Sequence, residues 1–143
     1  FISMKNSNEC GYTLIMSTEI IGLSHLEREI IANVVRYNIR DFDYDMMQLE
    51  TEAGQDLAGV SDRTAITILI AKLTAILRLA NSMDKTHKSK LIDCRMAVRE
   101  GQLVITTGYK GDLALESASF EQKAAFFEEI FGIRPVLKQK RRV

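Results

Sequence analysis

The stretch that decides the fold runs from Ile76 to Lys90 and reads ILRLANSMDKTHKSK. Apolar residues recur in its first half, and upstream of it, at alternating spacings of three and four, which is typical of one face of an α-helix. Ser61 or Asp62 suits the start of this helix, because a short polar side chain accepts a hydrogen bond from the first free amide groups. We therefore predict a long helix from there to about Ser82. Its apolar face is predicted to contain Ile66, Leu69, Leu73, Ile76, Ala80 and Met83, and its polar face Thr74, Arg78, Asn81, Ser82 and Lys85.

The end of this helix and the residues after it are basic. Arg78 and Lys85 are seven residues apart, so they share a face if the helix continues. Ammonium and guanidinium groups neutralise phosphates, and several weak contacts to a chain of repeated phosphates add together. An alternative interpretation is that these cations only complement the negative end of the helix and stay solvated. The candidate polyanion-binding residues are Arg78, Lys85, His87, Lys88 and Lys90.

An acidic segment separates this helix from an earlier one. Ser24 and Glu27 have the spacing of a capping box, in which each side chain accepts a hydrogen bond from the other residue's amide. Residues 41–61 are acidic and contain two glycines, so we expect a solvated loop. Their acidic residues have an EF-hand spacing, but Met46 stands where a calcium loop needs glycine. The residues predicted to be buried in the earlier helix are Ile30, Ile31, Val34, Val35 and Tyr37.

After Lys90 the apolar spacing changes from the helical period to two, which indicates β-strands. Residues 92–98 and 103–106 are predicted to form two strands joined by a tight turn at Glu100-Gly101. Residues 113–115 continue the alternation and predict a third, short strand.

A helix and a last strand complete the predicted order. Ser119 and Gln122 again have capping-box spacing, and Gly132 is a suitable end for the helix that follows. Residues 133–137 are predicted to form the last strand, at a sheet edge because of Pro135. Helices followed by a β-β-β-α-β order predict an α+β fold, with a helical bundle and a small, mostly antiparallel sheet on which one helix packs. That helix is predicted to bury Phe120, Ala124, Phe127 and Phe131.

The composition is that of an ordinary soluble globular domain. Lys plus Arg number 19, as do Asp plus Glu, so only a local patch can attract a polyanion. Two distant cysteines without a secretory pattern predict a cytoplasmic location. We expect no membrane partner, because no run reaches the roughly 18 apolar residues of a span. We expect no nucleic-acid partner, because the basic residues 138–142 lack aromatic platforms beside them. Phe1 is not a start methionine, so we expect a fragment of a longer protein.

The chain resembles the C-terminal HD-like region of the exopolyphosphatase / guanosine-pentaphosphatase (Ppx/GppA) family. Its residues 76–90 are similar to the family's LLRLADALDRSHKQK, and further similar segments occur in the family's order. The resemblance implies a degenerate HD-like helical domain over residues 1–90 and a small α+β C-terminal domain over residues 91–143. The other similar segments are residues 6–15, 21–32, 35–38 and 126–137.

The residues that hold a metal ion in HD phosphohydrolases are replaced in this chain. Asn8, Asn38 and Asn81 stand where the family pattern has histidine or aspartate. Imidazole and carboxylate groups hold a divalent ion and lower the pKa of its bound water, whereas neutral amides are weaker ligands. We therefore predict no catalytic residue and no metal site here. The three asparagines are expected to be buried amides with hydrogen-bond partners.

The resemblance implies a parent enzyme that releases terminal phosphate from inorganic polyphosphate or guanosine pentaphosphate. Its actin-like catalytic domain, with magnesium as cofactor, is expected outside this chain, which is therefore expected not to be an enzyme by itself. The family's C-terminal region implies polyphosphate binding and a homodimer. Two alternatives stay open, namely an independent HD-type metal-dependent nucleotide phosphohydrolase and an alarmone-binding regulatory module.

Overall fold

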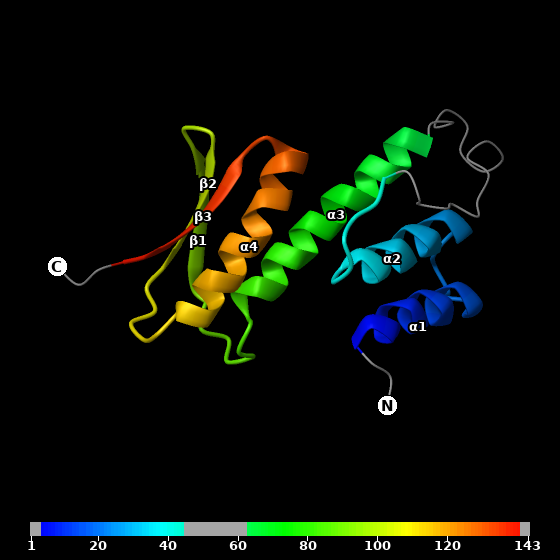
Figure 1. Ribbon diagram of the computed structural model, residues 1–143, viewed down its shortest axis with the longest axis horizontal. Helices are drawn as coiled ribbons and strands as arrows, with labels where there is room; N and C mark the ends of the chain where they lie inside the picture. Colours follow the sequence, from blue (N-terminus) through cyan, green and yellow to red (C-terminus); the bar gives the residue numbers. More distant parts are fainter. Residues whose placement is uncertain (1–3, 45–62, 141–143) are drawn as a thin grey trace. The chain divides into compact units, whose positions relative to one another are not determined.

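A computed structural model describes residues 4–44 and 63–140, and of residues 4–6 only the backbone (Figure 1). The described residues form helices first and then a small sheet with one more helix, so the predicted α+β class is confirmed. Contacts divide the chain into two units, of which unit 1 ends at Thr74 and unit 2 begins at Ala75, within helix α3. The division into domains 1–90 and 91–143 stays a prediction.

Unit 1 begins with two packed helices, α1 (Met4–Ser17) and α2 (His25–Tyr37). A methyl group added at Gly11 of α1 would come within 2.8 Å of Cγ1 of Val35 on α2, so the two backbones approach closely. The predicted capping box at the start of α2 is confirmed. The amide of Glu27 donates to Oγ of Ser24 over 3.2 Å, and the amide of Ser24 donates to Oε2 of Glu27 over 2.8 Å.

The buried face of α2 differs from the predicted one. Among the predicted residues only Tyr37 is fully buried, and Ile31 is 39% exposed. Ile30 and Val34 are partly buried against a cluster that includes Ile66 and Ile70 of α3. Because α2 contacts both α1 and α3, its buried arc is broad and takes in polar positions that apolar spacing alone does not identify. The fully buried residues of α2 are Leu26, Glu29, Ala32, Asn33 and Tyr37.

Helix α3 spans Arg63–Met83, which confirms the predicted long helix, while its predicted cap at residue 61 or 62 lies outside the described residues. The predicted apolar face is only partly right. Ile66 is buried and Met83 is partly buried, as predicted, but Leu69, Leu73 and Ile76 are 43%, 39% and 49% exposed and Ala80 is exposed as well. The buried face also carries small and hydroxyl side chains that the apolar spacing did not identify. Ser82 satisfies its buried hydroxyl by donating to the carbonyl of Leu79 over 2.6 Å. The buried residues of α3 are Ile66, Ile70, Ala71, Thr74, Ala75, Arg78, Leu79 and Ser82.

Unit 2 contains a three-stranded sheet in the order β1-β2-β3. Strands β1 (Cys94–Arg99) and β2 (Gln102–Thr107) pair antiparallel, and β3 (Arg134–Gln139) pairs parallel with β2. The predicted turn joins the first two strands, with φ values of 50° at Glu100 and 74° at Gly101, as a type I′ hairpin requires. Pro135 lies in β3 at the sheet edge, as predicted.

Helix α4 (Ala114–Phe131) connects β2 to β3, and its position contradicts two predictions. Leu113 is its N-cap residue, so the predicted strand over residues 113–115 is wrong. The predicted capping box of Ser119 and Gln122 is also wrong, because both residues lie inside the helix. Leu113 makes no side-chain capping bond, and Asp112, the residue before it, accepts at Oδ1 from the amide of Ala114 over 2.9 Å.

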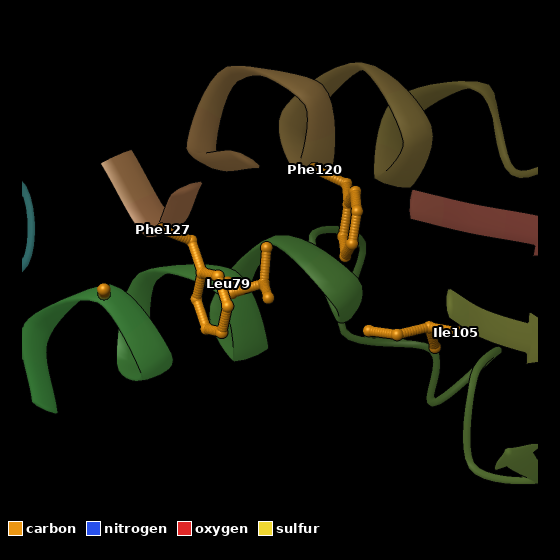
Figure 2. Packing of buried hydrophobic residues seen from close by; sticks show 5 residues of the cluster. Leu79, Ile105, Phe120 and Phe127 are labelled. Carbon is orange, nitrogen blue, oxygen red and sulfur yellow. The ribbon is translucent and has the colours of Figure 1, made fainter. Parts of the chain in front are cut away.

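The hydrophobic core of unit 2 lies between α4, the C-terminal half of α3 and one face of the sheet. Figure 2 shows Phe120 and Phe127 of α4 beside Leu79 of α3, with Ile105 of β2 close by. The predicted aromatic face of α4 is confirmed, since Phe120, Ala124 and Phe127 are buried and Phe131 stacks on Phe127 with ring centroids 4.5 Å apart. Gly132 ends the helix with φ of 70°, also as predicted.

Candidate polyanion-binding turn

The segment between α3 and β1 is a tight turn that carries most of the predicted cations, and we call residues 84–90 the basic turn. Asp84 organises its backbone. Its carbonyl accepts from the amide of His87 over 2.9 Å, and its Oδ1 accepts from the amide of Ser89 over the same distance. His87 and Ser89 have φ values of 52° and 50°, a region that non-glycine residues seldom adopt. The turn therefore has a defined shape that its own aspartate stabilises.

Lys90 anchors the basic turn to the start of α4. Its Nζ lies 3.2 Å from Oε2 of Glu116 and 2.9 Å from the carbonyl oxygen of Asp112. Thr86 donates to the other oxygen, Oε1, of Glu116 over 2.5 Å. The Glu116 side chain is 1% exposed and that of Lys90 is 13% exposed. One buried carboxylate thus holds the turn at two points.

The carboxyl group of Glu116 is kept ionised by these contacts. The hydrogen bond from Thr86 is the main reason that its pKa lies below the ordinary value, and Lys90 acts in the same direction. Burial acts against this shift, because it disfavours the charged form. The clamp is therefore charge-assisted, and such hydrogen bonds are stronger than neutral ones.

Arg78 also makes internal contacts. It lies on the buried face of α3, where the residue is 9% exposed. Its guanidinium carbon lies 4.7 Å from the ring centroid of Phe126, a cation–π arrangement. The guanidinium of Arg78 and the ammonium of Lys90 therefore stabilise unit 2, and neither is presented at the surface of the turn.

The other three predicted residues are exposed on the basic turn. Lys85 and Lys88 pair with no carboxylate among the described residues. His87 is 90% exposed, and its Nδ1 lies 3.9 Å from Oδ2 of Asp84. The structure thus brings Lys85, His87 and Lys88 together at the surface, with one carboxylate already engaged by the backbone.

A further exposed cation, which the sequence did not single out, lies in a loop that contacts the basic turn. Lys110 is exposed in the loop between β2 and α4. Gln139 donates to the carbonyl oxygens of Tyr109 and Gly111 over 2.7 Å and 2.9 Å, which holds this loop against the end of β3. Lys90 holds the same loop through Asp112. The sequence offers only a lysine between two glycines, and it does not indicate that this loop contacts the basic turn.

The three asparagines that the sequence comparison placed at HD metal-ligand positions are not buried. Asn8 and Asn38 are partly exposed and Asn81 is exposed, which corrects the expectation of three buried amides. The buried asparagine is Asn33, whose Nδ2 donates to the carbonyl of Glu29 over 3.0 Å. Within residues 4–44 and 63–140, no three His, Cys, Asp or Glu side chains gather closely enough to hold a metal ion.

Helix α3 passes a test of length and composition for a membrane-spanning segment, the only helix of the described residues to do so. The core helices of water-soluble proteins pass the same test, and α3 contributes to the cores of both units. This property is therefore weak evidence for a membrane partner.

Comparison with known protein families identifies the class of this protein. Residues 1–124 match the family described as "Ppx/GppA phosphatase, domain III". The match covers most of the chain, and the chain belongs to the Ppx/GppA phosphatase family. The predicted resemblance is thereby confirmed, and the chain represents the C-terminal region of an exopolyphosphatase-like protein. A search of curated proteins gave no match.

Proposed function

We propose that this chain is a non-catalytic region of an exopolyphosphatase-like phosphohydrolase and that its basic turn binds the polyphosphate chain. The observation that carries this proposal is the exposure of Lys85, His87 and Lys88 on a turn that Glu116 clamps from α4. Magnesium binding and phosphate release belong, in this proposal, to a catalytic domain outside this chain.

A clamped turn suits a polyanion better than a flexible one. Cations that are already held in place lose less conformational freedom on binding, so more of the attraction appears as affinity. Polyphosphate offers the same group many times, and a ligand of repeated groups gains affinity when several can be engaged at once. A turn with three exposed cationic or titratable side chains within four residues fits such a ligand.

The test is charge reversal on the turn in the full-length enzyme. The K85E/K88E variant should raise KM for long polyphosphate by about tenfold or more, since each exposed pair contributes up to about 1 kcal/mol and is replaced by repulsion. Short polyphosphate, which reaches fewer contacts, should be affected less. The matched control is K72E, which reverses an exposed lysine of α3 that belongs to unit 1 and not to the basic turn. Unchanged dependence on chain length in K85E/K88E would exclude the turn as the binding site.

The two alternative functions have direct tests of their own. A metal-dependent nucleotide phosphohydrolase requires a stoichiometric divalent ion and phosphate release from nucleotides by this chain alone. An alarmone-binding module requires guanosine tetraphosphate to bind more tightly than polyphosphate of equal charge. Elemental analysis and a competition assay therefore separate both from polyphosphate binding.

We further propose a homodimer, and the support is an apolar stripe on α3. Ile68, Leu69, Leu73 and Ile76 are between 39% and 49% exposed. Apolar side chains grouped on one helix face favour a protein interface. The L69E/L73E variant should be monomeric by light scattering at concentrations where the wild-type chain is dimeric. A wild-type chain that stays monomeric at high concentration would contradict the proposal.

A further inference from the structure

The sheet of unit 2 has one face that no described element of this unit covers. Leu103, Ile105 and Leu137 point toward α4 and belong to the core, so their neighbours in sequence point to the opposite side. We call the opposite side the outer face. The strand register arranges its side chains in three rows. These rows are Arg95, Thr106 and Lys138, then Ala97, Val104 and Val136, then Arg99, Gln102 and Arg134.

The outer face carries cations at its corners and no carboxylate. Arg95 and Arg99 of β1 and Lys138 of β3 are exposed, and among the described residues none of them has an ion-pair or hydrogen-bond partner. The fourth corner, Arg134, is engaged by carboxylates of α4, with Nη1 2.8 Å from Oε2 of Glu128. Three free cations therefore frame the face.

The middle row is apolar. Ala97, Val104 and Val136 are each partly exposed, and none of them belongs to the hydrophobic core. A row of apolar side chains on an open sheet face gains free energy when a partner removes it from water. An inorganic polyanion offers no apolar atoms and cannot use this row.

The spacing of the free cations also argues against a compact phosphate. Arg95 and Arg99 are four residues apart on one strand, roughly 13 Å, and Lys138 lies two strands away from Arg95, roughly 9.5 Å. No single phosphate group spans such distances. A single-stranded nucleic acid would use aromatic side chains on which bases stack, and the nine residues of the outer face include no aromatic one.

An acidic amphipathic helix fits these features. Two carboxylates seven residues apart on one side of a helix are separated by about 10.5 Å, which long arginine side chains on the sheet match. Apolar residues between them would lie over the middle row, as amphipathic helices do in hydrophobic grooves. We propose that the outer face docks an acidic amphipathic segment of a partner protein.

The experiment uses the 143-residue chain and a fluorescein-labelled, amidated 18-residue peptide of leucine, alanine and glutamate, with glutamates seven residues apart beside a leucine stripe. Binding is measured by fluorescence anisotropy in about 0.1 M salt, where charges within a Debye length of about 10 Å still interact. A peptide of the same composition in shuffled order is the control ligand. Amide chemical shifts locate the bound peptide on β1, β2 or β3.

Three double variants test which side chains bind the amphipathic peptide. R95E/R99E should weaken binding of the amphipathic peptide by about tenfold or more, since two attractive pairs become repulsive. V104T/V136T, which keeps the side-chain shapes, should weaken it by about fivefold through lost apolar contact. R63E/K72E, which reverses two exposed cations of α3, should leave it within about twofold, because its charges lie outside the docking face.

Several results would overturn the proposal. They are failure of the amphipathic peptide to bind, equal binding of the shuffled peptide, and an unchanged affinity in R95E/R99E. An unchanged affinity in V104T/V136T, with inorganic polyphosphate displacing the peptide, would assign the face to polyanions in general. Loss of self-association in R95E/R99E would assign it to a second copy of the chain. None of these results bears on K85E/K88E, so this proposal and the proposed function fail separately.

Discussion

Two neighbouring residues of α3, Leu69 and Ile70, test which face of this helix is buried. The apolar spacing of the sequence assigns Leu69 to the core, whereas the structure leaves it 43% exposed and buries Ile70 completely. Truncation of each residue to alanine therefore tests the packing of unit 1 directly. Ile70 packs with Leu26, Tyr37 and Ile66, so I70A removes buried methyl groups and leaves a cavity.

The expected magnitudes differ enough to be measured. Truncation of a fully buried isoleucine costs about 2–5 kcal/mol of the free energy of unfolding. Full burial of a leucine side chain is worth about 1.5–3 kcal/mol, and a residue that is nearly half exposed gains about half of that. L69A should therefore cost about 1 kcal/mol, and I70A should cost at least about 1 kcal/mol more.

Urea unfolding followed by far-UV circular dichroism measures both variants against the wild-type chain. The comparison is made at low protein concentration, so that any self-association through Leu69 does not add to its apparent contribution. Equal slopes of the free energy against urea would show that the variants change stability and not the unfolded state. A larger loss in L69A than in I70A would refute the assignment of the buried face.

Two further predictions concern unit 2. The pKa of Glu116 is lowered from its ordinary 4.5, so the ionised carboxylate is favoured more in the folded state than in the unfolded state. Its contribution to the free energy of unfolding is therefore present above about pH 4.5 and is lost as pH falls through the lowered pKa. E116Q should therefore be less stable than the wild type at pH 7 and should lose less stability between pH 5 and pH 3. Thermal unfolding over this pH range measures both. If the unfolding temperatures of E116Q and the wild type changed in parallel with pH, the proposed clamp by Glu116 would be contradicted. G132A should lose about 1 kcal/mol in urea unfolding, because Gly132 has φ of 70° at the end of α4. G108A is its control, since the space around Gly108 is open and its φ is not in the left-handed region; an equal loss in both variants would show that the φ of Gly132 is not the cause.

Features set by a few consecutive residues were predictable from the sequence. The capping box of Ser24 and Glu27 and the turn at Glu100-Gly101 each depend on the backbone preferences and hydrogen bonds of adjacent residues. Gly132 belongs to the same kind, since only its own φ and the last carbonyls of α4 are involved. The family itself could also be recognised, because the matching segments keep their order along the chain.

Features set by contacts between distant residues were not predictable in the same way. The sequence of α3 has an apolar stripe, yet the helix buries the adjacent face. That face includes Ala71 and Ala75, and Ser82 satisfies its buried hydroxyl by donating to the carbonyl of Leu79. The start of α4 was missed for a similar reason. The alternation of Leu113 and Leu115 suggests a strand, but the hydrogen bond that Asp112 accepts and the anchored side chain of Glu116 favour a helix there.

The candidate site shows why a cluster of cations in a sequence overstates a binding site. Lys88 and Lys90 are equivalent in charge and nearly adjacent, and the sequence gives no reason to separate them. Glu116, which lies 26 residues after Lys90, selects one of them for a buried ion pair and leaves the other in solvent. A buried pair is destabilising to break, since an unpaired charge would remain in a site shielded from water. Lys90 therefore shapes the turn, whereas Lys88 and Lys85 are available to a ligand. Different defects are therefore predicted for these lysines. K90A should lower the free energy of unfolding, whereas K85A and K88A should lower the affinity for polyphosphate and leave the free energy of unfolding unchanged.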